Sequence, residues 1–294
     1  MPTSFAQVFP APAKINRFLH ITGRRADGYH ELQTVFQFLG LEDRLRFEPL
    51  PGGRVEMADA AAVDGSDNLC VRAARRVFDA AGRREGVRIH LEKRLPVGGG
   101  VGGGSSDAAT TLVALNHLFE LGLGEAELAA LGLRLGADVP VFVHGRAAWA
   151  QGVGEHLVPV EPDCPPALLI DPGVPVSTGT MFSAGELTRD RAPERISHSV
   201  DGATFVNVFE PVVRRHHPEI ARVLDWLGAW TDRVRLSGTG GCVFGLFPDR
   251  ATAERARGAQ PEPWRSWVTP LRNESPLRAW LPGDRHGAMQ TTGP

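Results

Sequence analysis

A glycine-rich tract is the segment in which residue type and spacing most clearly indicate chemistry. Six of the seven residues from Gly98 to Gly104 are glycine, and Ser105 and Ser106 follow directly. Glycine lets the backbone approach a ligand closely and adopt positive φ, at an entropic cost of about 0.5–1 kcal/mol each relative to alanine. A flexible hinge would not need so many glycines. We therefore expect the backbone N–H groups to bind an anion at the start of the next helix, most naturally a polyphosphate.

Three kinds of phosphate-binding loop can be compared with this tract. The P-loop requires Gly-Lys-Ser/Thr, but no lysine follows these glycines. A dinucleotide pattern, G-x-G-x-x-G, fits Gly98, Gly100 and Gly103. Its acidic partner at the required spacing would be Glu120, which falls at the end of a predicted helix rather than a strand. The remaining kind is a glycine-serine loop that a proline precedes and a helix follows.

Two lysines stand out because the chain otherwise relies on arginine. Lys14 and Lys93 are the only lysines among 32 lysine and arginine residues. Lysine carries a compact point charge that suits a phosphate, whereas arginine presents a wide planar fork. Each lysine is therefore a candidate phosphate ligand, and the alternative is an ordinary solvated side chain.

Strand and helix patterns place these residues on an α+β framework. The first predicted strand, Val8–Ile21, has Lys14 and Asn16 on one face and Ile15 and Leu19 on the other. A helix is predicted to open at Asp67, and another to follow the glycine tract with Ser105 or Ser106 as its cap. Other expected strands are 32–39, 44–48, 54–57, 87–91, 147–151, 156–160, 167–171, 234–236 and 242–247, and other expected helices are 128–135, 220–230 and 251–258.

The order of these elements divides the chain. Strands and helices are mixed without regular βαβ alternation, which is typical of α+β folds. The proline-rich stretch Pro159–Pro166 is the best linker candidate. We therefore predict an N-terminal domain over 1–160, a C-terminal domain over 161–281 and a disordered tail over 282–294.

Composition limits the class of protein. With 294 residues, 42% hydrophobic and 22% charged, the chain has the make-up of a globular enzyme. A net charge of −2 gives no general attraction to nucleic acid. No apolar run approaches the ~18 residues of a membrane span, and the N-terminus lacks a secretory pattern. Three scattered cysteines suggest reduced thiols, so we expect a cytoplasmic protein with no nucleic-acid or membrane partner.

Five separated motifs resemble the GHMP kinases, which include galactose, homoserine, mevalonate and phosphomevalonate kinases. The match runs in consistent order from about Pro12 to about Leu277, with Val101 and Asp107 standing where the family usually has leucine and asparagine. Asp107 would add a negative charge near the phosphates. The motifs are Pro12–Asn16, Arg25–His30, the glycine loop, Gly136–Pro140 and Ser237–Gly241.

The narrower similarity is to the branch that acts on a cytidine diphosphate-linked methylerythritol in the non-mevalonate isoprenoid pathway. It implies transfer of the ATP γ-phosphate to the 2-hydroxyl of that small molecule, with Mg²⁺ accompanying ATP. It also implies an N-terminal domain like domain 2 of ribosomal protein S5, a ferredoxin-like C-terminal domain, and a monomer or weak homodimer.

Phosphoryl transfer to an alcohol needs somewhere for the proton to go, and Asp138 is the best candidate. The resemblance implies that it is the catalytic base, while a helix N-cap ahead of Pro140 is a competing and compatible role. Lys14 is the expected partner, because a nearby ammonium would keep the carboxylate ionised and lower the pKa of the acceptor hydroxyl. Asn16, on the same face, could hydrogen-bond the substrate polyol or Asp138.

The remaining site assignments concern the two substrates. The resemblance implies that Tyr29 stacks on cytosine, His30 bonds its edge and Phe182 closes the sandwich, although core packing is an alternative for Phe182. Asn68 could contact the adenine or ribose or cap a helix, and Lys93 could reach the phosphates. The expected ATP-binding loop comprises Pro96, Val97, Gly98, Gly99, Gly100, Val101, Gly102, Gly103, Gly104, Ser105 and Ser106, and Ser105 and Ser106 could bind phosphate or magnesium.

Two rival functions are considered. A homoserine or mevalonate-type kinase would have no use for the Tyr29–His30 pair. A non-catalytic ATP-binding regulator would be expected to lack Asp138 or Lys14, and both are present. The pair His216–His217 has no further ligand at metal-binding spacing and is interpreted as surface, so no metal ligand is assigned.

Overall fold

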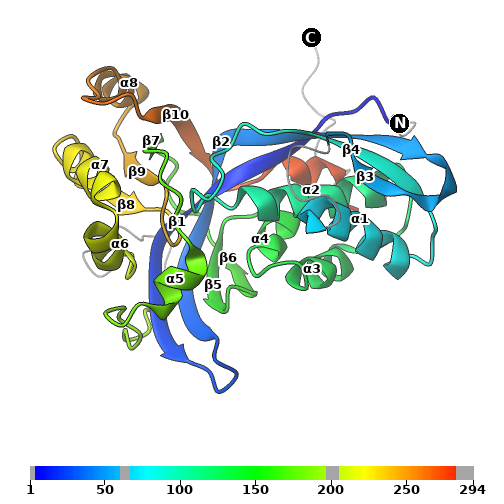
Figure 1. Cartoon of the computed structure of the whole chain (residues 1–294), viewed down its shortest axis with the longest axis horizontal. Helices are drawn as coiled ribbons and strands as arrows, with labels where there is room; N and C mark the ends of the chain where they lie inside the picture. The colour runs from blue at the N-terminus through cyan, green and yellow to red at the C-terminus, as the bar shows by residue number, and fades with distance from the viewer. Residues whose placement is uncertain (1–3, 60–66, 197–204, 283–294) are drawn as a thin grey trace, which may run out of the picture.

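A long hairpin forms the centre of the fold (Figure 1). In the computed structural model, which describes residues 4–59, 67–196 and 205–282, β1 (Phe9–Arg24) runs antiparallel to β2 (His30–Leu50). The N-terminal part of β1 is buried throughout, as expected for a strand covered on both faces. Its register against β2 shifts three times, once between Asn16 and Leu19.

The hairpin belongs to a sheet that spans both halves of the chain. The described residues form a ten-stranded sheet with the strand order β3-β4-β2-β10-β7-β9-β8. In addition, β1 and β5 each pair with β2, and β6 pairs with β5. Strand β10 joins the halves because it pairs with β2 on one side and β7 on the other. The bounds are β3 Val55–Met57, β4 Gly86–Glu92, β5 Ala148–Gly152, β6 His156–Pro159, β7 Pro166–Asp171, β8 Val234–Leu236, β9 Val243–Leu246 and β10 Arg265–Arg272.

Helices cover the two ends of this sheet. Four of them gather beside β2–β4, and three others lie with β7–β10 at the opposite end (Figure 1). The first group is α1 (Leu69–Ala80), α2 (Gly103–Leu118), α3 (Glu125–Leu133) and α4 (Val139–His144). The second is α6 (Glu210–His216), α7 (Pro218–Gly228) and α8 (Arg250–Gly258). The short α5 (Thr178–Ser183) lies near the middle, and the 3₁₀ turns are η1 (Pro51–Gly53) and η3 (Pro276–Trp280).

The apolar core has three main parts. One packs α1–α4 against the N-terminal strands, and a second packs α6–α8 against the C-terminal strands. The third lies between them and contains residues from both halves, including Ile15, Val101 and Phe244. Because Val101 belongs to the glycine tract, this core anchors the tract to both halves of the molecule.

Most predicted elements are confirmed, with instructive differences. Segments 32–39 and 44–48 form one strand, and β10, α5 and α6 were not predicted. Helix α2 is buried on nearly all sides. Its predicted cap is wrong: the cap position is Gly102, with Ser105 and Ser106 inside the first turns.

Other calls on boundaries and faces have mixed outcomes. Leu19 lies on the face of Lys14 and Asn16, not with Ile15, because the register shift after Asn16 reverses the alternation. Helix α1 is capped by Asn68, whose side chain accepts a hydrogen bond from the Cys70 amide, rather than opening at Asp67. The domain boundary at residue 160, between β6 and β7, stays a prediction. The predicted tail lies outside the described residues apart from Pro282.

Among the helices of the described ranges, none combines the length and the apolar character that crossing a membrane requires.

Candidate active site

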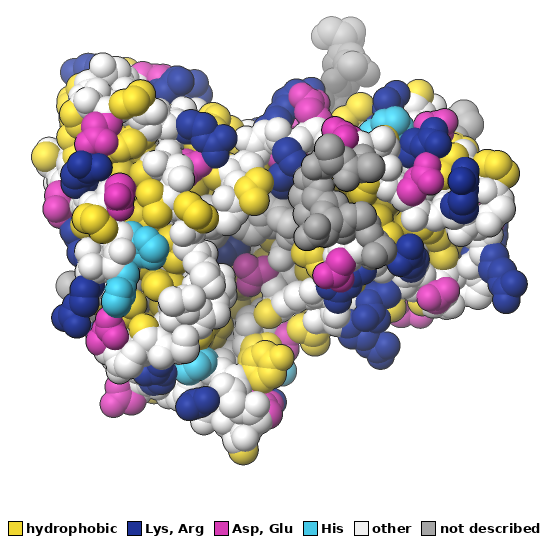
Figure 2. All heavy atoms as spheres, viewed as in Figure 1, with side chains coloured by type: hydrophobic (Ala, Val, Ile, Leu, Met, Phe, Trp, Pro, Cys, Tyr) yellow, Lys and Arg dark blue, Asp and Glu magenta, His cyan; other side chains and the backbone are white. Residues whose placement is uncertain are grey.

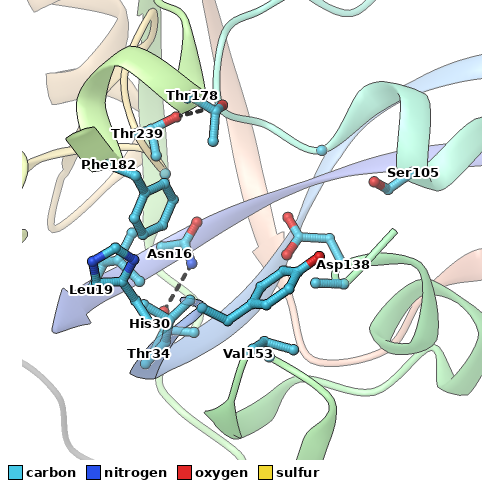
Figure 3. Close-up of a pocket in the computed structure, with 18 of the residues that line it drawn as sticks. Asn16, Leu19, His30, Thr34, Ser105, Asp138, Val153, Thr178, Phe182 and Thr239 are labelled. Atoms are coloured by element: carbon cyan, nitrogen blue, oxygen red, sulfur yellow. Dashed lines mark hydrogen bonds between the residues drawn. The ribbon is translucent and has the colours of Figure 1, made fainter. Parts of the chain in front are cut away.

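A cavity of about 980 Å³ opens where the two halves of the molecule meet. Figure 2 shows the surface hollowed between the two lobes, with acidic and basic side chains interspersed on this face. The cavity is lined by residues of β1, β2, α5, the glycine tract and the segment that precedes α4. In Figure 3, Asp138 and Ser105 lie at one end, His30 and Phe182 at the other, and Asn16 between them. The cavity therefore has two chemically different ends.

The lysine and carboxylate predicted to act together do meet. Lys14 Nζ lies 3.2 Å from Asp138 Oδ2, and the Lys14 side chain is 3% exposed against 33% for Asp138. Asp138 occupies the N-cap position of α4, but its side chain makes no capping hydrogen bond. The carboxylate is therefore turned to the cavity and the ion pair instead of being used by the helix.

Three further contacts hold the Lys14 ammonium. It donates to Asn16 Oδ1 at 2.7 Å and to the Gly100 carbonyl at 3.3 Å, and it lies 5.2 Å from the centre of the Phe36 ring. Asn16 in turn donates from Nδ2 to Thr34 Oγ1 at 2.9 Å (Figure 3). Asn16 thus bonds Lys14 and not Asp138, and its contact with the substrate polyol stays a prediction.

The glycine tract is interlocked with the second glycine turn. Ser237 Oγ donates to the Gly100 carbonyl at 3.0 Å, and the Cys242 amide donates to the Gly99 carbonyl at 3.0 Å. Gly100 has φ of +73°, and a Cβ there would overlap the Ser237 carbonyl. Backbone contact this close is possible only without a side chain. The expected second glycine turn is therefore beside the site, where Gly238 and Thr239 line the cavity.

The start of α2 faces the same cavity. Gly102 caps it with φ of 72°, and Gly100, Gly102 and Ser105 are on the cavity wall. The first N–H groups of a helix have no partner within it and carry its positive dipole end. Ser106 is fully buried, and its hydroxyl has no hydrogen-bond partner within the described residues. The arrangement can bind a phosphate next to the Lys14–Asp138 pair.

Lys93 is engaged elsewhere. Its ammonium lies 2.5 Å from Asp43 Oδ2 and 2.9 Å from Asp107 Oδ2, close to the first residue of α2. Asp43 also accepts from the amides of Arg94 and Leu95. Burial raises the pKa of Asp107 to about 7, although the Lys93 charge opposes that shift. Lys93 and Asp107 thus lie against the start of α2 and stabilise the end of the glycine tract. Neither residue lines the cavity.

The opposite end of the cavity is aromatic. The rings of His30 and Phe182 are stacked with centroids 5.1 Å apart and planes at 29°, and Phe209 meets Phe182 edge-on. Tyr29 lines the same cavity and is 65% exposed. Phe182 lines the cavity and also packs against the core formed by α6–α8 and the C-terminal strands. Aromatic rings at this end of the cavity can stack on a flat heterocycle.

The structure gathers nine of the predicted site residues around the cavity and leaves the others outside its wall. Those that line it are Lys14, Asn16, Tyr29, His30, Gly100, Gly102, Ser105, Asp138 and Phe182. Those that do not are Asn68, Lys93, Pro96, Val97, Gly98, Gly99, Val101, Gly103, Gly104 and Ser106.

Sequence reasoning missed several lining residues, among them Thr34, Thr178 and Arg189. Thr178 lies four residues before Phe182 in a small-residue segment, which could have drawn attention to it. Arg189 carries no distinguishing signal in a chain so rich in arginine.

Comparison with known proteins agrees with this geometry. Residues 68–146 match the family model for the GHMP kinases N terminal domain, and residues 191–265 match that for the GHMP kinases C terminal domain. The chain is 53% identical over 280 residues to the 4-diphosphocytidyl-2-C-methyl-D-erythritol kinase of Halorhodospira halophila, covering 93% of this chain and 96% of that one. It is 52% identical over 273 residues to the kinase of the same name from Pseudomonas paraeruginosa, covering 92% and 96%.

Solved structures give the same result. A crystal structure of 4-(cytidine 5'-diphospho)-2C-methyl-D-erythritol kinase superposes with a TM-score of 0.79 at 38% identity, covering 90% of this chain and 99% of that one. A mevalonate kinase superposes with a TM-score of 0.67 at 14% identity, covering 91% and 100%, which supports the fold alone.

Proposed function

Because the chain belongs to the 4-diphosphocytidyl-2-C-methyl-D-erythritol kinases of the GHMP kinase family, we propose that it transfers the γ-phosphate of ATP to the 2-hydroxyl of 4-diphosphocytidyl-2-C-methyl-D-erythritol. The observation that carries this proposal is the 3.2 Å Lys14–Asp138 pair beside the glycine tract, in a cavity whose other end is aromatic.

In this reaction Asp138 is the base. It accepts the proton of the attacking hydroxyl while that oxygen bonds to the γ-phosphorus and ADP leaves. Lys14 stabilises the charge on the transferred phosphoryl group, and its burial strengthens that interaction by excluding water. The contacts from Asn16 and the Gly100 carbonyl keep the ammonium at one position, which supports its role as a fixed electrostatic group.

The glycine tract and the N-terminus of α2 hold the triphosphate. Gly100, Gly102 and Ser105 form the adjoining wall, which supports placing the γ-phosphate there. We assign the remaining residues from Pro96 to Ser106 to the shape of this loop. The Asn68 side chain caps α1 in the structure. Its contact with the adenine or ribose of ATP remains a proposal.

Magnesium would enter with ATP. Mg²⁺ prefers oxygen ligands and commonly binds through one or two protein oxygens together with substrate phosphates. Ser105 Oγ offers such an oxygen on the cavity wall, while the described residues contain no cluster of three or more His, Cys, Asp or Glu able to hold a metal alone. When bound, the ion would offset the negative charge of the phosphates.

The cytidine end of the substrate would lie between Tyr29 and Phe182, with His30 at the edge of the base. Asp138 lies at the opposite end of the same cavity from His30 and Phe182, which supports this orientation (Figure 3). We also propose a cytoplasmic location, which the three unpaired cysteines Cys70, Cys164 and Cys242 support.

An ATP-consumption assay on the purified protein tests this function. We expect turnover that depends on the cytidine diphosphate substrate, and a new phosphomonoester in the phosphorus NMR spectrum of the product. Homoserine and mevalonate serve as competing acceptors. Turnover of either one in place of the cytidine substrate, or no turnover with any acceptor, would overturn the proposal.

A further inference from the structure

Arg189 lies on the cavity wall next to the aromatic end but uses most of its hydrogen-bonding capacity inside the protein. Its Nη1 donates to the Leu187 carbonyl at 3.0 Å, and its Nη2 donates to the carbonyls of Phe182 and Ala184 at 2.9 and 2.7 Å. Its Nε donates to His30 Nε2 at 3.2 Å. Four of the five N–H groups of the guanidinium are therefore occupied.

The bond from Arg189 decides which nitrogen of His30 carries the proton. A guanidinium has only donors and stays protonated, so His30 Nε2 must accept with its lone pair. A neutral imidazole with a lone pair on Nε2 has its hydrogen on Nδ1. The described residues provide no hydrogen-bond partner for that Nδ1, so its N–H is available to a ligand in the cavity.

The electrostatic surroundings keep the ring neutral. Burial lowers the pKa of His30, and the positive charges of Arg189 and Arg24 lower it further. A second proton on Nε2 would also face the Arg189 N–H directly. The imidazole is therefore neutral with a defined tautomer at neutral pH.

We propose that Arg189 is a positioning residue that sets base specificity: it fixes His30 as an Nδ1–H donor, which suits cytosine and disfavours uracil. Cytosine has an unprotonated N3 that accepts a hydrogen bond, whereas uracil has N3–H, a donor. Two opposed donors would leave both hydrogens without acceptors in a partly buried site, which is costly. This inference rests on the proposed function, because it requires that the base of the substrate meets His30.

The same guanidinium also organises the neighbouring ring. Its bonds to the carbonyls of Phe182 and Ala184 fasten the end of α5, so the stacking ring and the edge-reading imidazole are both held by one side chain. The rival role is direct binding of the substrate diphosphate by Arg189. The four internal bonds argue against that role, because they leave only one N–H group of the guanidinium to bind a phosphate.

A measurement on the free enzyme tests the tautomer without any substrate. Nitrogen-15 NMR separates protonated from unprotonated imidazole nitrogens, and a His30→Ala variant identifies the His30 signals. We expect protonated Nδ1 and unprotonated Nε2 in the wild type, and a shift toward protonated Nε2 in Arg189→Met. A wild-type ring protonated on Nε2 overturns the inference, whether or not the protein proves to be a kinase.

Kinetics test the consequence for specificity. The ratio of kcat/KM for the cytidine substrate to that for its uridine counterpart should fall by about tenfold in Arg189→Met, the size expected when a hydrogen bond loses its directional partner. In the His30→Ala background the same substitution should leave the ratio unchanged. Arg215→Met, at an exposed arginine outside the cavity, is the matched control and should leave the ratio at its wild-type value.

Each other outcome is informative. Equal losses for the two substrates in Arg189→Met would indicate a phosphate-binding or purely structural role and would overturn the proposal. If that variant does not fold, Arg189→Lys, which retains the charge but cannot reach all four acceptors, should show a smaller fall in the ratio. A wild type that turns over neither substrate but shows the expected tautomer would refute the proposed function and leave the tautomer assignment standing.

Discussion

Lys14 and Asp138 illustrate how the surroundings of a residue define its chemistry. Lysine is otherwise a long, flexible side chain, yet here Asn16, Gly100, Phe36 and Asp138 hold its end in place. A fixed ammonium in a buried position costs no reorganisation when charge develops on a phosphate. The role of each partner can therefore be tested one atom group at a time.

Asp138→Asn replaces the proton acceptor by an amide of nearly the same size. We expect kcat to fall by ~10²–10⁴-fold, the usual contribution of general base catalysis. ATP affinity should change little, because the carboxylate is not part of the glycine tract. Steady-state turnover and calorimetric titration with ATP measure the two effects, and turnover close to that of the wild type would contradict the base assignment.

Tyr29→Ala removes one side of the expected base sandwich. The KM for the cytidine substrate should rise roughly 5–100-fold, because stacking on a base contributes ~1–3 kcal/mol. Stability should be unaffected, since the side chain is 65% exposed. Tyr29→Phe keeps the ring and is the control. An unchanged KM in the alanine variant, measured with saturating ATP, would exclude the stacking role.

At the scale of elements, the glycine tract is held from two sides. The turn between β8 and β9 contacts it through Ser237 and Cys242, and the Lys93–Asp43–Asp107 cluster lies behind the first residue of α2. Glycines that were expected to serve only a ligand also permit backbone-to-backbone packing with the protein itself.

Gly100→Ala tests this packing. Positive φ costs a non-glycine residue about 1–2 kcal/mol, and the new Cβ would also overlap the Ser237 carbonyl. We expect a lower midpoint of urea unfolding and at least a roughly tenfold weaker affinity for ATP. Gly104→Ala is the matched stability control, because its Cβ would be 3.5 Å from Leu69 Cδ1. A Gly100 variant as stable as the Gly104 variant would rule out the interlocking described above.

Asp107 gives the same region a dependence on pH. Burial raises its pKa from the ordinary aspartate value of 3.8 to about 7; the Lys93 charge opposes this shift and Asp43 adds to it. Between these values the folded state binds a proton that the unfolded state has lost, so this group's contribution to stability falls as pH rises from about 4 to about 7.

Asp107→Asn should remove that dependence. Relative to the wild type, the variant should gain stability as pH rises through this window and be more stable by roughly 1–3 kcal/mol at pH 8. Urea denaturation of both proteins between pH 5 and pH 8 measures the difference. A constant difference across that range would show that Asp107 keeps an ordinary pKa.

At the scale of the whole molecule, one sheet and one polar network connect the halves. Strand β10 joins β2 to β7, and the segment between β6 and β7 is fastened by Asp163. Asp163 accepts from Arg17, whose side chain is 1% exposed, and from Arg233, both at 2.8 Å. Although burial acts in the opposite direction, these hydrogen bonds lower the pKa of Asp163.

Asp163→Ala should destabilise the protein by roughly 2–3 kcal/mol, because the buried Arg17 cation would lose its charged hydrogen bond to the Asp163 carboxylate. The control is Asp225→Ala, which removes an exposed partner of Arg214 and should cost about 0–1 kcal/mol. Chemical denaturation compares the two. Equal effects would mean that the contact between Arg17 and Asp163 contributes no more than a surface ion pair.

Local pattern was sufficient for much of this molecule. The strands expected at 87–91, 147–151 and 156–160, and the glycine tract between a strand and a helix, depend on nearby residues and are confirmed. A helix near Asp67 is also confirmed, although it begins at Leu69 with Asn68 as its cap. The chemical types of the site residues were also readable, because only certain side chains can accept a proton, neutralise a phosphate or stack on a base.

Tertiary structure decided what depends on contacts between distant residues. The register shift in β1 moves Leu19 to the cavity, and the shift exists only because β1 pairs with β2. Lys93 bonds Asp43 and Asp107, and Arg189 bonds His30, and these partners lie 14 to 159 positions away in the chain. Sequence alone determined which chemistry was available. The fold determined which groups face one another, since distance and burial, rather than residue type, set the strength of hydrogen bonds and ion pairs.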